Sequence, residues 1–329
     1  MTRIIRSILW ATLTFILVSA CGADQAQISN VRSPSATEQT ALSETVRLVK
    51  HAMGETQVPT NPQRLVTLHT VYLGNALALR IKPIGTIGWY SKLTGIAPYE
   101  AHLNNLPGEF TLLGSHDQPN LETMLRLKPD LIIGFDYYED IYNQLSKIAP
   151  TVLFKWEGEP PWKNSVRELS KVLNRDEEVE QLFNQYNQRT QNLKQEIQKK
   201  FTHLSVSVVD IDSSSIRFAL KNSFLGSILQ DIGVSRPPSQ DKDGIYENLP
   251  VALELIPQMD ADVMFITTSQ DQGSLAVVKQ LKQHPLWLNL EAVKQDRAYQ
   301  VNPEYWFGDN MIAANLVLDD LFKYLFEGE

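Results

Sequence analysis

A helix-to-strand unit that occurs twice is the sequence feature that most constrains the fold of this chain. The segment Leu121 to Phe135 reads LETMLRLKPDLIIGF, and the segment Leu253 to Thr267 reads LELIPQMDADVMFIT. In both, a Leu-Glu pair opens a short helix, an Asp follows eight residues after the Glu, and the apolar run of a buried strand comes next. The repeat predicts two half-chains of the same α/β kind.

The acids of the repeat, Glu122 and Glu254, fall in the first turn of each predicted helix. A carboxylate there complements the positive end of the helix dipole. Such an acid is ordinary helix chemistry, so the pattern alone leaves open whether the pair has a function.

The first residues of the chain indicate secretion. Met1 to Ala20 carries two arginines, then an apolar run from Ile8 to Val18, then small residues before Cys21, as a signal peptide does. The apolar run is shorter than the about 20 residues that span a bilayer. The stretch ending in Cys21 resembles the bacterial lipoprotein signal, in which the cysteine becomes the lipidated first residue. Because Cys21 is the only cysteine of the chain, it can form no internal disulfide, and we expect it to be acylated.

Charge and composition narrow the possible partners. Loss of residues 1–20 removes two arginines and no acid, which changes the formal net charge from −8 to −10. An acidic protein is a poor partner for nucleic acid and for an anionic membrane surface, so we expect the lipid alone to hold it on the membrane. Residues 21–44 are rich in Ala, Gln, Ser and Thr without apolar periodicity, and we expect a flexible tether.

The remaining chain is long enough for two domains. Helical and strand patterns alternate over residues 45–161 and again over 204–329, which predicts two lobes, each with a parallel sheet covered by helices. Residues 162–203 keep apolar spacings of three and four with no Gly or Pro inside, apart from a possible brief break at 175–178. We interpret this segment as one long helix that joins the lobes, although a coiled-coil helix would look similar.

Several short motifs together resemble the iron-siderophore substrate-binding proteins of ABC importers. They include residues 51–56, 58–66, 119–122 and 127–133 in the first half, and 285–293, 305–308 and 313–321 in the second. Each motif is short, but the likeness covers nearly all of residues 46–326. It implies the fold of class III periplasmic binding proteins, with two Rossmann-like lobes, parallel-rich sheets and a single long connecting α-helix.

The resemblance also implies a function for the two repeated acids. In this family one acidic residue on each lobe docks on arginines of the two permease subunits, and Glu122 and Glu254 fall at the matching positions. Two carboxylates on rigid helix starts would orient the protein on a two-fold partner more than they would add affinity.

The ligand implied by the resemblance is a ferric siderophore bound between the lobes, on loops that follow the sheet strands. Such a ligand already fills the coordination positions of iron, so the protein would need no cofactor or metal ligands of its own. Aromatic faces suit its apolar parts, and Arg suits its carboxylate or hydroxamate oxygens. The candidates are Trp89, Tyr90, Tyr137, Trp156, Arg217, Tyr246, Tyr305 and Trp306. Trp306 is favoured by its Gly-flanked loop, and Arg217 by its place on a strand, where a guanidinium otherwise needs a buried partner.

Other functions are less well supported by the sequence. The six histidines show no metal-binding spacing, although His69 and His116 follow predicted strands and could line the cleft. No nucleophile elbow, phosphate loop or dinucleotide motif occurs, and scattered acids such as Asp136 and Glu139 are not placed as a catalytic pair. We therefore expect a non-enzymatic, monomeric, lipid-anchored carrier outside the plasma membrane that serves an ABC permease dimer. The alternatives are a heme or cobalamin carrier of the same fold and a secreted enzyme.

Overall fold

The computed structural model describes residues 46–88, 96–156 and 162–327, which belong to one compact unit, Glu44–Glu329. The predicted signal peptide (1–20), the tether (21–44) with Cys21, and the candidates Trp89 and Tyr90 lie outside the described residues. Within the described part no helix is both long and apolar enough to cross a bilayer.

The first half of the unit is built on a six-stranded sheet with the order β6-β5-β4-β3-β7-β8. Its strands are parallel except for the edge pair β5 and β6, as the alternation of helices and strands predicts. The strands are β3 (Leu65–Thr67), β4 (Gly85–Gly88), β5 (Thr111–Ser115), β6 (Gln118–Pro119), β7 (Leu131–Phe135) and β8 (Thr151–Phe154). An antiparallel hairpin of β1 (Val46–His51) and β2 (Gly54–Pro59) precedes this sheet.

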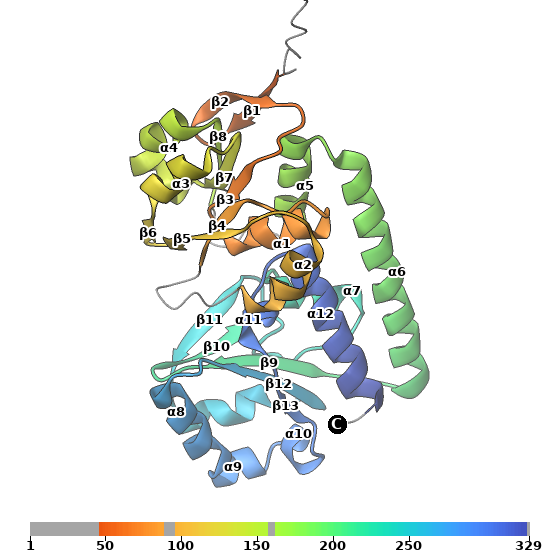
Figure 1. Cartoon of the computed structure of the whole chain (residues 1–329). Helices are drawn as coiled ribbons and strands as arrows, with labels where there is room; N and C mark the ends of the chain where they lie inside the picture. Colours follow the sequence, from red (N-terminus) through yellow and green to blue (C-terminus); the bar gives the residue numbers. More distant parts are fainter. Residues whose placement is uncertain (1–45, 89–95, 157–161, 328–329) are drawn as a thin grey trace, which may run out of the picture. The chain divides into compact units, whose positions relative to one another are not determined.

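Successive strand residues face opposite sides of the first sheet, and each side is covered by its own helices (Figure 1). Leu65 and Leu131 pack with α1 (Thr70–Ala78), whereas their neighbours Val66 and Ile132 pack with α3 (Leu121–Leu127) and α4 (Tyr142–Ile148). Strands buried on both faces therefore read as continuous apolar runs. Three short helical segments complete this half: η1 (Ala97–Tyr99), α2 (Glu100–Asn105) and η2 (Asp136–Ile141).

The second half is built on a mixed five-stranded sheet with the order β11-β10-β9-β12-β13. Its strands are β9 (Val206–Ile211), β10 (Ser215–Ala219), β11 (Tyr246–Pro250), β12 (Val263–Thr268) and β13 (Ala298–Gln300). β9, β12 and β13 run parallel to one another, whereas β10 is antiparallel to both of its neighbours, β9 and β11. The sequence patterns do not predict this antiparallel strand. Only residues 212–214 separate β9 from β10, and a link that short cannot return the chain to a parallel start. The Asp212 carboxylate closes this turn by accepting the N–H groups of Ser214 and Ser215, both at 2.7 Å.

Helices also cover both faces of the second sheet. Val208 and Phe265 point toward α7 (Phe224–Asp231) and α12 (Met311–Phe322), and Met264 and Ile266 point toward the other layer. That other layer consists of η3 (Leu253–Met259), α8 (Gln272–Lys282), α9 (Pro285–Leu288) and α10 (Glu291–Lys294). Two further short helices, α11 (Pro303–Trp306) and η4 (Lys323–Glu327), pack on the side of α7 and α12.

The sequence repeat corresponds to the same structural unit in each half. α3 leads into β7, and η3 leads into β12. The repeated aspartates share one task, because each accepts backbone N–H groups where the neighbouring strand begins. Asp130 accepts from Gln63 at 2.7 Å and Arg64 at 2.9 Å, just before β3, and Asp262 accepts from Ser205 at 2.7 Å, just before β9. η3 is a short 3₁₀ helix with Pro257 inside it.

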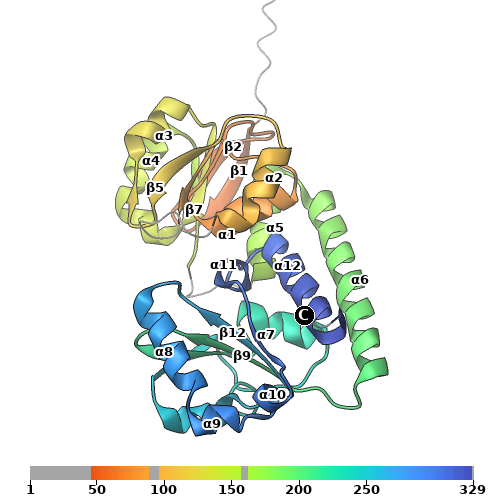
Figure 2. The same cartoon turned by 60° about the horizontal axis from the view of Figure 1, so that its bottom comes forward.

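The segment between the sheets, predicted as one long helix with room for a brief break at 175–178, is two helices, α5 (Trp162–Leu173) and α6 (Asp176–Lys200). The break falls at Asn174, whose φ of 57° is left-handed, and at Arg175, where the sequence allowed a brief interruption. Neither helix is a free strut. Leu169 and Leu173 of α5 pack in the first half, and the buried face of α6, including Phe183 and Leu193, packs in the core of the second half beside α12 (Figure 2).

A buried polar contact joins α1 of the first half to α12 of the second. The Asn310 amide caps α12, with Oδ1 accepting the Ala313 N–H at 3.0 Å and Nδ2 donating to the Tyr99 hydroxyl at 2.6 Å. The Met311 N–H donates to Asn75 Oδ1 of α1 at 3.0 Å. Both asparagine side chains are fully buried, so their hydrogen bonds stand in for lost hydration. Gly74 permits this approach, since a Cβ at that position would overlap the Asn310 amide.

Candidate functional site

Four rings gather where strands of the first sheet end. His69 follows β3, His116 follows β5, Tyr137 follows β7 and Trp156 follows β8. The ring centroids of His116 and Tyr137 are 4.6 Å apart, and the Trp156 ring lies 5.8 Å from His69 and 5.9 Å from Tyr137. The carboxyl edge of an open α/β sheet is where such proteins bind ligands. We call these four residues the aromatic cluster.

His69 forms the buried base of the aromatic cluster. It is the N-cap of α1, and its Nδ1 accepts the Val71 N–H at 3.1 Å. Burial, with a smaller contribution from the nearby His116, lowers the pKa of His69 to about 3. The imidazole is therefore neutral at physiological pH and acts as an aromatic wall and a helix cap.

The other three rings are half-buried and so keep a face that a ligand can reach. Trp156 is held by its backbone N–H, which donates to Asp136 Oδ1 at 2.8 Å. Burial raises the pKa of the Tyr137 hydroxyl far above its ordinary value, so this group stays protonated. His116 lies 3.3 Å from the Asp117 carboxylate, and its backbone carbonyl accepts the Tyr138 hydroxyl at 2.9 Å. The cluster is a largely apolar surface with polar edges.

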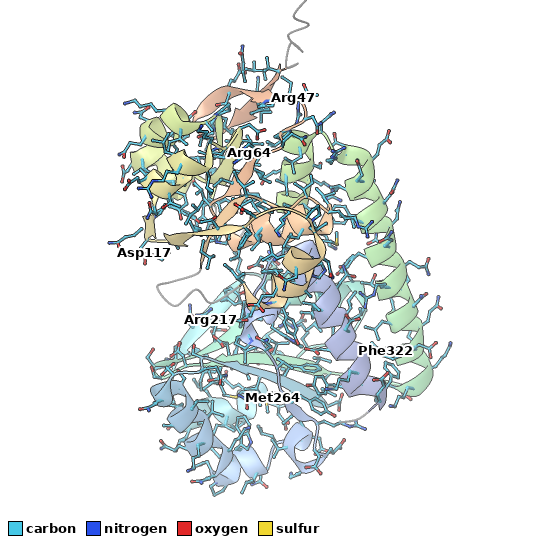
Figure 3. The ribbon with its side chains drawn as sticks, viewed as in Figure 1. Arg47, Arg64, Asp117, Arg217, Met264 and Phe322 are labelled. Carbon is cyan, nitrogen blue, oxygen red and sulfur yellow. The ribbon has the colours of Figure 1, made fainter. Side chains whose placement is uncertain are left out.

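A second group of residues surrounds Arg217 on β10, labelled in Figure 3. The guanidinium carbon lies 5.3 Å from the Tyr246 ring centroid and 5.9 Å from that of Phe307. Its Nε donates to Asn248 Oδ1 at 3.1 Å and lies 3.9 Å from the Asp210 carboxylate. Two rings, an amide and an acid thus fix a cation that keeps a third of its side chain exposed. We call Arg217, Tyr246 and Phe307 the arginine clamp.

Asp210 is the acid that partly balances Arg217. Its burial raises the carboxyl pKa, against the lowering effects of a hydrogen bond from Thr267 at 2.8 Å and of Arg217 itself. Burial wins because the ion pair is long, at 3.9 Å, and so offsets only part of the lost hydration. The arginine clamp therefore keeps much of its positive charge available to an anionic oxygen.

The structure corrects the expectation for Trp306. It lies in the short helix α11 and not in a loop, and its side chain is fully buried against Phe265. The indole N–H donates to Asp320 Oδ2 at 2.8 Å, and the Tyr305 hydroxyl donates to the same oxygen at 2.7 Å. Burial and Asp320 raise the pKa of Tyr305. Trp306 thus offers no surface to a ligand, and the shared carboxylate explains why both aromatic residues turn toward α12.

The predicted site residues therefore separate into groups. The structure brings Tyr137 together with Trp156, and Arg217 with Tyr246. Phe307 was missed as a candidate, although it directly follows Tyr305 and Trp306 in the sequence. His69 and His116 were considered only as possible cleft residues, and their position directly after strands was the signal for them. Within the described ranges no group of three or more His, Cys, Asp or Glu side chains is arranged to hold a metal ion.

The repeated acids are on the surface. Glu122 on α3 has 74% of its side chain exposed and forms an ion pair with Arg126, one turn along the same helix. Glu254 on η3 is also exposed. Both acids are therefore accessible to a partner.

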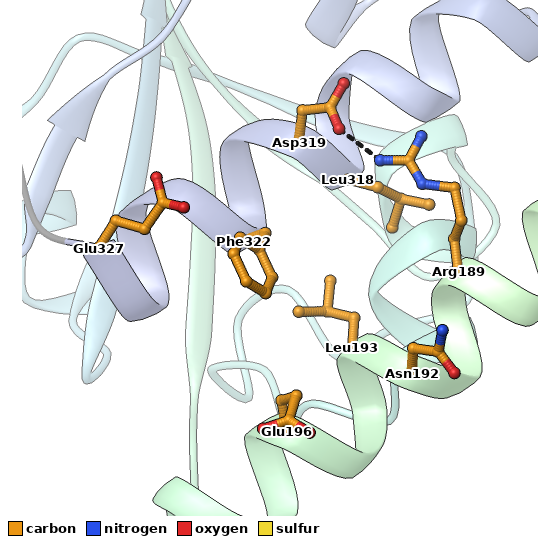
Figure 4. A pocket seen from close by; sticks show the side chains of 8 residues that line it. All are labelled: Arg189, Asn192, Leu193, Glu196, Leu318, Asp319, Phe322 and Glu327. Carbon is orange, nitrogen blue, oxygen red and sulfur yellow. Dashed lines mark hydrogen bonds and ion pairs between the residues drawn. The ribbon is translucent and has the colours of Figure 1, made fainter.

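A pocket of about 470 Å³ lies between α6 and α12, away from both groups of candidate residues (Figure 4). Leu193, Leu318 and Phe322 form its apolar part, and the ion pair between Arg189 and Asp319 lies at its edge. None of the predicted ligand-binding residues lines it.

Comparisons with known proteins give a consistent result. The family model described as periplasmic binding protein matches residues 65–305. YfiY of Bacillus subtilis (strain 168), a probable siderophore-binding lipoprotein, is 33% identical over 97% of each chain. The achromobactin-binding periplasmic protein of Dickeya dadantii (strain 3937) is 30% identical over 80% of this chain and 86% of its own. The structure of Staphylococcus aureus SirA complexed with staphyloferrin B superposes with a TM-score of 0.72 and 27% identity, over 85% of this chain and 98% of SirA.

Proposed function

Because this chain belongs to the periplasmic binding protein family, we propose that it is an extracytoplasmic substrate-binding protein that captures a ferric siderophore and delivers it to an ABC permease for iron uptake. One relative is a probable siderophore-binding lipoprotein and another is an achromobactin-binding protein, and the chain is similar to both along most of its length.

The observation that carries the proposal is the pairing of an apolar ring surface with a cation. The aromatic cluster suits the organic envelope of a siderophore, and the arginine clamp suits its anionic oxygens. A ferric siderophore already coordinates its iron, so recognition requires this kind of outer surface and no metal ligands from the protein. In this proposal the ligand lies between the two groups, and Trp89 and Tyr90 remain further candidates.

The remaining parts of the proposal concern delivery. Glu122 and Glu254 dock on matched cations of the two permease subunits, and lipidated Cys21 holds a monomeric protein on the plasma membrane through the tether. The protein is a carrier without catalytic activity and returns its ligand unchanged.

Tryptophan-fluorescence quenching tests the ligand class. The mature chain is titrated with iron-loaded and iron-free hydroxamate, citrate-like and catecholate siderophores, with heme, and with bare divalent ions. We expect saturable binding of at least one ferric siderophore and weaker binding of its iron-free form. Binding of none of the siderophores, together with tight binding of heme or of a bare ion, would reject the proposal.

A matched pair of variants tests the site. Arg217→Gln removes the charge of the arginine clamp, and we expect it to weaken binding by about tenfold, the usual loss when a charged hydrogen bond to a ligand is removed. Arg175→Gln removes an arginine that pairs at 3.2 Å with Glu178 on α6, and it should bind as the wild type does. Equal affinities of the two variants would move the ligand away from Arg217.

A heme carrier is the second candidate because His116 and Tyr137, both able to act as axial ligands, lie 4.6 Å apart between ring centroids at the sheet edge. Heme ligated by either residue would shift its Soret absorbance on titration. His116→Ala or Tyr137→Phe would remove that shift only if heme is bound at this edge.

A further inference from the structure

Apolar side chains accompany both docking acids on the surface. Leu125 is 56% exposed and Leu253 is 37% exposed, whereas Met124 of α3 and Ile256 and Met259 of η3 are buried. Scattered exposed leucines are common on any protein. These two are distinctive because each lies beside one acid of the sequence repeat.

Each acid has one apolar residue directly before it and another three positions after it, but the two helix types arrange these residues differently around the acid. On α3, Leu125 lies three residues after Glu122, and on η3, Leu253 lies one residue before Glu254. Positions −1 and +3 relative to an acid are four residues apart and so lie on one face of an α-helix, and in a 3₁₀ helix position +3 eclipses the acid. The complementary positions are also apolar, since Leu121 precedes Glu122 and the exposed Pro257 follows Glu254.

The second half adds further apolar surface. α9 packs against η3 and carries Leu286 and Leu288, which are 38% and 55% exposed. A partner that approached Glu254 would therefore meet apolar side chains and a carboxylate together. An isolated exposed ion pair contributes little and is screened by salt, whereas covered apolar surface is insensitive to screening.

The two acids differ in how they are neutralised. Glu122 is paired with Arg126 at the (i, i+4) spacing, while Glu254 makes no ion pair with any residue that the structure describes. A cation of the partner would have to displace Arg126 from Glu122 but would meet Glu254 unopposed. The exchange at Glu122 costs little, because the pair is solvated on both sides.

We propose that each docking point is a composite of one carboxylate and adjoining apolar side chains, those of Leu121 and Leu125 next to Glu122 and those of Leu253 and Pro257 next to Glu254. This proposal rests on the proposed function, in which the two acids dock on an ABC permease. The partner it fits presents, at two equivalent places, an Arg or Lys next to apolar side chains. Arg126 lowers the affinity of the first docking point by competing for Glu122.

Uptake by right-side-out membrane vesicles tests the proposal. The vesicles come from source cells deleted for this gene, and the probe is the mature chain loaded with the ⁵⁵Fe siderophore that the quenching panel identifies. The protein concentration for half-maximal uptake is measured for Leu125→Ser, for Leu253→Ser and for the double variant. Leu48→Ser is the matched control, because Leu48 on β1 is 57% exposed and lies on a different element. Solution affinity for the siderophore and thermal stability are measured for every variant.

We expect the half-maximal concentration to rise about fivefold for each leucine variant and more for the double variant, with no change for Leu48→Ser and no loss of siderophore affinity. The leucine effects should persist when salt is raised from about 50 mM to 500 mM, whereas the effect of Glu122→Ala with Glu254→Ala should shrink. Arg126→Gln should lower the half-maximal concentration at low salt.

Two results would overturn the composite contact. If the leucine variants matched Leu48→Ser while the double glutamate variant lost uptake, docking would be purely electrostatic, and the proposed function would stand. If the glutamate variants also had wild-type uptake, the docking surface would lie elsewhere. Loss of siderophore binding in the quenching panel would instead count against the proposed function itself.

Discussion

The buried Asn310 amide at the start of α12 gives the sharpest stability prediction. Asn310→Ala removes the cap of α12, the hydrogen bond to the Tyr99 hydroxyl at 2.6 Å and the hydrogen bond to the Gly308 carbonyl at 2.5 Å. Loss of an N-cap costs about 1 kcal/mol. A buried group left without its partner costs about 1–3 kcal/mol more. We therefore expect a loss of about 3 kcal/mol in the free energy of unfolding.

The matched control is Asn120→Ala. Asn120 also caps a helix, α3, and its Oδ1 accepts the Thr123 N–H at 2.8 Å. Unlike Asn310, it is exposed, and its side chain makes the capping hydrogen bond without the two buried hydrogen bonds that the Asn310 Nδ2 donates. Its loss should cost about 1 kcal/mol. Urea unfolding followed by circular dichroism measures both variants. If Asn310→Ala cost no more than Asn120→Ala, the buried part of the Asn310 contact would add nothing to stability, and the reasoning from burial would be wrong.

Three further predictions concern buried groups. His69→Asn keeps a capping oxygen but removes a base whose folded pKa, about 3, lies below the unfolded value of about 6.5. The stabilisation from neutral His69 is complete above the unfolded pKa and is lost as the pH falls toward the folded pKa. Between pH 7 and pH 5 the free energy of unfolding should therefore fall by about 2 kcal/mol more for the wild type than for the variant, as measured by urea unfolding at each pH. Equal pH slopes would contradict the neutral, buried imidazole. Gly74→Ala should destabilise the protein by about 1–3 kcal/mol, because the new Cβ overlaps the Asn310 amide, and wild-type thermal stability would show that α12 can shift freely. Asp231→Ala should cost about 1–3 kcal/mol in urea unfolding, because it leaves the buried Tyr186 hydroxyl, now bonded at 2.7 Å, without its acceptor, and Tyr186→Phe in the same background should recover part of that loss.

Local pattern was enough to predict most of the regular structure. Helices and strands alternate over both ranges in which the sequence predicts them, and the helix-to-strand repeat recurs as α3 with β7 and as η3 with β12. These features depend on side chains within one or two turns of each other, so a sequence records them directly. The likeness of residues 46–326 to siderophore-binding proteins was also readable from short motifs, and the family match confirms it.

The candidate site was only partly predictable for the opposite reason. The sequence placed Tyr137 and Trp156 after strands, and strand order then brought them together. Nothing local distinguishes Trp306, which is buried on Asp320, from Phe307, which lies beside Arg217, although the two are adjacent. Which of two neighbouring rings faces a ligand depends on contacts from distant segments.

The sequence by itself determined the kind of protein: two halves built on one repeated unit, their helices and strands, and the family to which the chain belongs. The tertiary structure decided the antiparallel edge of the second sheet, the division of the connecting segment at Asn174, and the burial of Asn310 against Tyr99. The reason is that spacing and caps act within a few residues, whereas exposure, ion pairing and the surroundings of a side chain are set by residues that folding alone brings near.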